Sequence, residues 1–124
     1  SLLEADGSGE ENTEGEALAQ VVEATPQPEV FDLKTAERPQ MIREGFLRIQ
    51  QHRFDEAQQI FAYAISQDST DPNVLHGLGW AYQEQGNSQE AVKHYCRLVG
   101  LNEAPADLKK ECKARVKQLE GVCP

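Results

Sequence analysis

The chain of 124 residues has no long uninterrupted apolar run, so the sequence predicts no membrane-spanning helix. Positive charge is also scarce, because 12 Lys and Arg residues stand against 21 Asp and Glu, a formal net charge of -9. Proteins that follow a nucleic-acid backbone need a basic surface. The charge balance therefore argues against nucleic acid as a partner.

Residues for metal or catalytic chemistry are few and scattered. The chain has three cysteines and three histidines, with no CxxC motif and no zinc-like Cys/His spacing. His52 falls in an expected turn, His76 on an inner helix face and His94 on an outer one, so no pair can share a metal. Neither a glycine-rich phosphate loop nor a Ser-His-acid arrangement is present. We expect no enzyme activity, no metal and no cofactor.

Residues 1–37 are predicted to be an acidic, proline-containing tail or linker. They hold many acidic side chains and one basic one, Lys34, while Pro26 and Pro28 prevent a continuous helix. A short apolar patch predicts at most a brief helix near 16–24. The sequence begins with Ser1 and not with Met, so two origins are compatible with it: a processed product and a fragment of a larger protein.

Apolar residues recur at helical spacing from Pro39 onward, which predicts five main helices. The first spans roughly 39–51, and the second starts at 54 and ends before 68. Further along the chain, start and stop signals are clear. They are Asp71 and Pro72 for the third helix, Gly86 at its end, Asn87 or Ser88 for the fourth, and Pro105 and Gly121 around the fifth.

The sequence repeats itself after 34 residues. Gly45, Gln51, Glu56 and Ala57 recur as Gly79, Gln85, Glu90 and Ala91, and aromatic or aliphatic residues recur in kind. Leu78, Gly79, Tyr82, Ala91 and Tyr95 match the tetratricopeptide pattern in register. The chain thus resembles the tetratricopeptide repeat family.

The resemblance implies an all-α fold of antiparallel helix pairs, stacked as a short right-handed superhelix. The tetratricopeptide-like domain would cover residues 38–121, with repeats at 38–71 and 72–104 and a capping helix at 105–120. The small residues Gly45, Ala57, Gly79 and Ala91 would allow close approach of the paired helices.

In this family the first helices of each pair line a concave groove that takes a peptide or helix. By register, the resemblance implies a groove of Ile42, Arg43, Phe46, Ile49, Gln50, Asn73, His76, Gly77, Trp80 and Gln83, with Lys110, Ala114 and Lys117 from the closing helix. Phe46 and Trp80 would be apolar anchors for a partner. Alternatively they fill the superhelix, or the tail covers them through Val30, Phe31 and Leu33.

The expected function is a protein–protein interaction module, such as an adaptor, chaperone or assembly factor. The alternative is a structural element that self-assembles through its exposed first helix, forming homo-oligomers. Direct insertion into a membrane is not expected.

Cys96 and Cys112 come to nearly the same level when the fourth and fifth helices fold antiparallel, which allows a disulfide between them. The other hypothesis is that both are reduced apolar residues in the core. Oxidation would indicate an exported or periplasmic protein, whereas reduced thiols fit the cytoplasm. Cys123 is expected near the fraying end of the chain.

Overall fold

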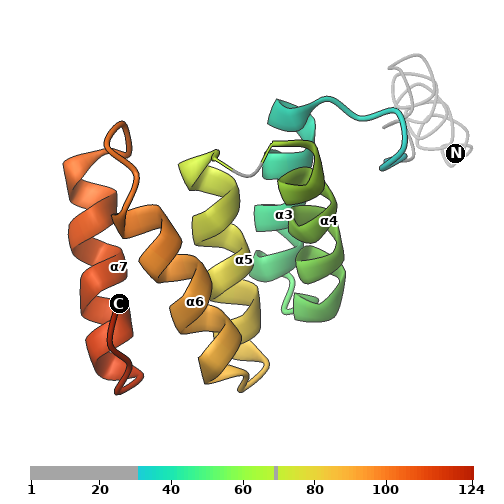
Figure 1. Cartoon of the computed structure of the whole chain (residues 1–124). Coiled ribbons are helices and arrows are strands. Elements are labelled where there is room, and N and C mark those ends of the chain that lie inside the picture. The colour runs from blue at the N-terminus through green and yellow to red at the C-terminus, as the bar shows by residue number, and fades with distance from the viewer. Residues whose placement is uncertain (1–30, 69) are drawn as a thin grey trace, which may run out of the picture. The chain divides into compact units, whose positions relative to one another are not determined.

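The computed structural model describes residues 31–68 and 70–124. These residues form five helices and no strand: α3 (Arg38–Gln50), α4 (Phe54–Gln67), α5 (Pro72–Glu84), α6 (Ser88–Val99) and α7 (Ala106–Gln118). Each helix packs against the next one along the chain, and α3 also contacts α5. Figure 1 shows α7 at one end of the row and the pair α3 and α4 at the other, with α5 and α6 between them. The all-α prediction is confirmed; the brief helix expected near 16–24 lies outside the described residues.

The 34-residue period is visible in the helices themselves. Their first residues Arg38, Pro72 and Ala106 are each separated by that spacing, so α7 begins like the first helix of a third pair. Each of these three helices ends in the same turn, with a left-handed residue at His52 (φ 61°), Gly86 (φ 82°) and Glu120 (φ 59°).

Backbone hydrogen bonds define these turns. Asn87 N–H donates to the carbonyl of Tyr82 at 2.9 Å, and Gly121 N–H donates to that of Val116 at the same distance. This is the six-to-one bond of a Schellman turn, which needs a left-handed residue just before the donor. Glycine enters that region without steric penalty, and Gly86 does so here.

Side-chain caps fix where two helices begin. Asp71 Oδ1 accepts from the Asn73 N–H at 2.9 Å, and Asn87 Oδ1 accepts from the Glu90 N–H at 3.3 Å. Both bonds satisfy amides that the helix leaves unpaired. The cap of α6 is therefore Asn87, one of the two residues that the sequence suggested.

Close packing around Phe61 joins the first three helices. The ring is fully buried, and a Cβ added at either Gly45 or Gly77 would collide with it. Phe61 comes from α4 and the two glycines from α3 and α5, so its ring is wedged between two helix backbones. Gly77 therefore belongs to the core and not to an exposed groove, which corrects the expectation drawn from register.

A second apolar cluster lies under α7. It contains Leu75, Ala91, Tyr95, Leu98 and Cys112, all fully buried. Burial raises the pKa of the Cys112 thiol to about 11. The thiol is thus neutral and behaves as an apolar residue of the core.

The segment before α3 also contacts the domain. Phe31, Leu33 and Ala36 pack against the core cluster that contains Phe61. In Figure 1 this segment leaves the N-terminal end of α3 on the side away from α5 and α7. Phe31 and Leu33 therefore support the first helix pair; Val30, which was grouped with them, lies outside the described residues.

Candidate functional site

A row of three rings runs across the first helices of the two pairs. Phe46 of α3 has its ring centroid 5.8 Å from that of His76 and 6.2 Å from that of Trp80, both on α5. The centroids of His76 and Trp80 are 5.7 Å apart. All three residues are half-buried, so one side of each remains accessible. We call Phe46, His76 and Trp80 the aromatic row.

Helix α7 extends this row with Arg115. Its guanidinium carbon lies 4.9 Å from the centre of the Trp80 ring, a cation–π geometry. The same guanidinium donates to Gln83 Oε1 at 3.1 Å and forms an ion pair with Glu111 Oε2 at 3.0 Å. Arg115 is therefore fixed in place by three partners and shields part of Trp80.

Gln83 connects three helices at this point. Its Oε1 accepts from Arg115 of α7 and from the Tyr95 hydroxyl of α6, the latter at 2.7 Å. Burial raises the pKa of Tyr95 above its usual value, so the hydroxyl keeps its proton and donates. Gln83 is thus a structural link as well as part of the predicted face.

His76 carries the most deeply placed polar group of the aromatic row. Its side chain is 13% exposed, and its Nε2 lies 3.5 Å from Glu111 Oε2, longer than a hydrogen bond. Burial lowers the pKa of His76, the Glu111 carboxylate raises it, and Arg115 lowers it; the net shift is downward. The imidazole is therefore neutral at neutral pH.

A hollow of about 310 Å³ adjoins Trp80 at the C-terminal ends of α3 and α5. Its lining combines apolar and aromatic surface with three polar groups. The lining residues are Ile49, Gln50, His52, Phe54, Trp80 and Glu84. We call it the Trp80 hollow; its volume lies at the lower end of the range for ligand pockets.

The structure brings together only part of the predicted groove. Phe46, His76 and Trp80 contact one another, and Gln83 is joined to them through Arg115. Ile42 is half-buried against the first core cluster, as Phe46 and Trp80 are, but no ring contact links it to the aromatic row. The remaining predicted polar residues lie on the surface: Arg43, Gln50, Asn73 and Lys110 are exposed.

Two of the groove predictions need correction. Ile49 is only 5% exposed and belongs to the core, so it contributes no more than a wall of the Trp80 hollow. From α7, the side chains that reach the aromatic row are Glu111 and Arg115, where register predicted Lys110. The cause is the rotation of α7, which is set by the buried positions Cys112 and Val116.

Several site residues were missed by the sequence analysis. Glu111 and Arg115 flank the buried positions of α7, while His52, Phe54 and Glu84 lie at helix ends. For α7 a signal was available, because residues 111 and 115 are four apart and share a helix face. The helix-end residues gave no signal, since hydrophobic periodicity carries no information about turns.

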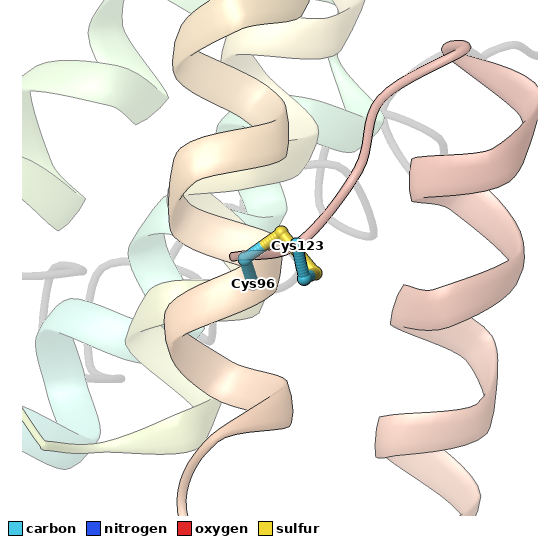
Figure 2. The surroundings of a disulfide bond; sticks show 2 residues. All are labelled: Cys96 and Cys123. Atoms are coloured by element: carbon cyan, nitrogen blue, oxygen red, sulfur yellow. A yellow bond between two sulfur atoms is a disulfide. The ribbon is translucent and has the colours of Figure 1, made fainter.

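The Cys96–Cys112 disulfide, one of the two hypotheses from the sequence, is not formed, and the alternative of a reduced core residue holds for Cys112. Cys96 is bonded to Cys123, with the two Cα atoms 5.3 Å apart, and Cys112 is a buried free cysteine. Figure 2 shows how the segment after α7 crosses to α6 and ends at this bond. Cys112 is fully buried within the second core cluster, whereas Cys96 is half-buried at its edge and is bonded to Cys123.

His94 is also placed differently from the prediction of an outer helix face. It is 7% exposed, and its ring stacks on that of Tyr82 with an angle of 3° between the planes. Burial lowers the pKa of His94, although the nearby Glu90 carboxylate opposes the shift. His94 is therefore part of the packing between α5 and α6.

In the part of the chain that the structure describes, no group of three or more His, Cys, Asp or Glu residues could hold a metal ion. None of the described helices is long and apolar enough to cross a membrane.

Comparisons with known proteins agree with the helical repeat. A family model described as tetratricopeptide repeat matches residues 48–118, more than half of the chain. Comparison with curated proteins gave no match, and comparison with solved structures gave none either. The family match covers α4 to α7 completely, and these include the helices α5 and α7 that carry Trp80 and Arg115. The chain belongs to the tetratricopeptide repeat family.

Proposed function

We propose that this chain is a protein–protein interaction module that binds a peptide or helix of a partner on the face formed by α3, α5 and α7. The main observation in support is the aromatic row beside the Trp80 hollow, where Trp80 is half-buried and partly accessible. Repeats of this family generally mediate protein–protein interactions and are typically not enzymes. An adaptor, chaperone or assembly factor fits this description.

The chemistry of the face favours a partner with apolar anchors. Phe46 and Trp80 offer aromatic surface, and aromatic residues are over-represented among the residues that dominate binding energy. Polar groups surround them, with Gln50 and Glu84 at the rim of the Trp80 hollow. An extended or helical segment that places one apolar side chain in this hollow would use both features.

The affinity should be modest because few repeats contribute area. Only three helices line this face, so we expect a dissociation constant near the micromolar range, about −8 kcal/mol. Arg115 already holds Trp80 in place, which reduces the ordering that binding requires.

Peptide selection from a random displayed library tests the proposal. Peptides selected on the full chain should protect Trp80 from acrylamide quenching, and Trp80→Ala should weaken their binding at least tenfold. Phe46→Ala should act similarly, whereas Leu47→Ala, at an exposed position of the same helix, should not. Circular dichroism confirms that each variant is folded. Peptides that bind Trp80→Ala and the parent chain equally well would reject the aromatic row as the site.

Self-assembly through α3 is the second candidate, and one observation favours it. Leu47 on this first helix of the stack is 41% exposed, an apolar side chain that a neighbouring copy would cover. Sedimentation velocity over a hundredfold concentration range checks this candidate. A single monomer peak throughout would reject it, whereas a dimer that Leu47→Ser dissociates would support it.

The Cys96–Cys123 bond bears on the compartment. Disulfides persist in oxidising environments, so this bond favours an exported or periplasmic protein over a cytoplasmic one.

A further inference from the structure

A second and larger hollow lies away from the aromatic row, between α6 and the segment that follows α7. Its volume is about 550 Å³, and its walls are mostly apolar. One wall is a stripe on α6, and the other is the end of the chain. The lining residues are Gln89, Val92, Lys93, Cys96 and Arg97 on α6 and Val122, Cys123 and Pro124 on the segment. We call it the disulfide hollow.

The disulfide builds this hollow. Cys96 belongs to one wall and Cys123 to the other, so their bond fixes the distance between the walls. Figure 2 shows the segment meeting α6 at this bond. A smaller hollow of about 220 Å³ continues along α6 and shares Gln89 and Val92 with it. Together they form an elongated surface rather than an isolated pit.

Close packing also holds the segment in position. A Cβ added at Gly121 would come within 2.6 Å of a methyl carbon of Val92, so the backbone of the segment rests directly on α6. The Schellman turn at Glu120 directs the chain toward this contact. The walls are therefore set by a turn, a backbone contact and a covalent bond.

An apolar side chain of this site is exposed to solvent. Val122 lines the hollow and is 84% exposed, the most exposed large apolar residue described. The open side of the hollow therefore offers an apolar contact for a side chain of a partner.

The charges at the rim indicate the chemistry of that partner. Lys93 and Arg97 both line the disulfide hollow, one turn apart on α6, and no acidic residue lines it. Lys93 is exposed, and it forms no ion pair within residues 31–68 and 70–124. Glu120 lines only the smaller neighbouring hollow, near Ser88. A carboxylate is thus attracted to the part of the surface where Lys93 lies.

We propose that the disulfide hollow is a second docking site, which takes an acidic peptide segment with one apolar anchor. The apolar side chain would pack between Val92 and Val122, and a carboxylate beside it would pair with Lys93. This site is separate from the aromatic row and exists in this form only while Cys96 and Cys123 are bonded. Binding is opposed at long range by the negative net charge of the protein, so the local cations provide the selectivity.

The test uses the full chain and a fluorescein-labelled six-residue peptide with two central leucines flanked by glutamates. Fluorescence anisotropy should show binding that weakens as salt increases. Peptides with lysines in place of the glutamates, or with serines in place of the leucines, should bind at least tenfold more weakly. No binding of the acidic peptide at millimolar protein would overturn the proposal.

Two matched pairs of variants locate the site. Lys93→Glu should reduce the affinity at least tenfold, whereas Lys113→Glu, an exposed lysine of α7 outside the lining, should change it less than twofold. Val122→Ser should weaken binding, and Leu47→Ser should not. Equal losses for the two lysine variants would show general charge attraction and overturn the assignment.

Redox state provides an independent readout. Cys123→Ser releases the segment, and the labelled peptide should then bind at least tenfold more weakly while the helical circular dichroism signal is retained. Trp80→Ala should leave binding of this peptide unchanged, which separates this site from the aromatic row. Undiminished binding to Cys123→Ser would overturn the proposal. So would a dimer of the peptide-free protein that Val122→Ser dissociates, because the occupant would then be a second copy.

Discussion

The guanidinium carbon of Arg115 lies 4.9 Å from the centre of the Trp80 ring. This contact joins α7 to α5 across the face that we propose for partner binding. The side chain of Arg115 is 21% exposed, so the interaction is partly shielded from water. Arg115 therefore affects both the stability of the last helix and the accessibility of Trp80.

Arg115→Ala should lower the free energy of unfolding by about 1 to 2 kcal/mol, because the cation–π contact and the hydrogen bond to Gln83 are both lost. It should also raise acrylamide quenching of Trp80. Urea unfolding measures the first effect and fluorescence the second. Lys113→Ala on the same helix serves as the control. Unchanged quenching in Arg115→Ala would contradict the role of Arg115 as a cover for the ring.

Gly77→Ala should destabilise the protein by about 2 kcal/mol, because the added methyl group collides with the buried ring of Phe61. Gly100→Ala is the matched control, since the nearest atom to a Cβ there is 3.6 Å away. That variant should change stability by about 0.5 kcal/mol or less, or increase it slightly. Similar losses of stability in both variants would mean that the effect comes from the helix backbone and not from a collision with the Phe61 ring.

The equivalent left-handed positions should respond in opposite directions. Gly86→Ala forces a side chain into φ 82° and should destabilise by about 1 kcal/mol, whereas Glu120→Gly relieves the same penalty at φ 59° and should stabilise by about 1 kcal/mol. Thermal unfolding of the two variants measures both effects. A destabilised Glu120→Gly would indicate that the Glu120 side chain makes a contact worth more than the backbone penalty.

Stability should fall as the pH decreases below about 6.5, the usual histidine pKa, because His76 and His94 both have lowered pKa values in the folded state. In that range the unfolded chain binds more protons than the native one, so protonation favours unfolding. This destabilisation is absent above the histidine pKa of the unfolded chain. It grows as the pH falls and is complete once the pH lies below the pKa values of the folded state.

The double variant His76→Gln and His94→Gln isolates this contribution from the protonation of carboxylates, which affects both proteins. Its urea midpoint should change less between pH 7.5 and 5.5 than that of the parent chain. Identical pH profiles for the parent chain and the double variant would disprove the assignment.

Loss of the disulfide should destabilise the protein by about 3 kcal/mol, because the bond closes a loop between residues 27 apart. Cys96→Ser combined with Cys123→Ser gives a form in which this effect can be measured by urea unfolding. Cys112→Ser should also destabilise the protein, because it buries a hydroxyl group in the core. Dithiothreitol should still lower the stability of that variant, because its Cys96–Cys123 disulfide is intact.

The sequence predicted the helices and their pairing well, for a physical reason. Caps and small residues act locally, so Asp71, Asn87 and Gly86 could be interpreted without knowledge of the packing. The close approach at Gly79 was also predictable, and a Cβ there would lie 2.6 Å from the Tyr95 ring. The right-handed superhelix remains a prediction.

The cysteine pairing and the face of α7 could not be predicted in the same way. The sequence places Cys96 and Cys112 at about the same height along two antiparallel helices, but the rotation of each helix about its own axis decides whether two side chains meet. An error of one residue turns a side chain by about 100°, which is the difference between Lys110 and Glu111. The path of the chain after Gly121 has no periodicity, so it gave no indication that Cys123 would reach α6.

The covalent link from α6 to the last residues has a mechanical consequence. A tension applied to the chain beyond Cys123 passes through the two sulfur atoms directly into α6. Residues 97–122, including the whole of α7, then lie in a closed loop that carries no load. The contact between Arg115 and Trp80 is therefore protected from stretching as long as the bond is oxidised, and reduction would transfer the load to α7.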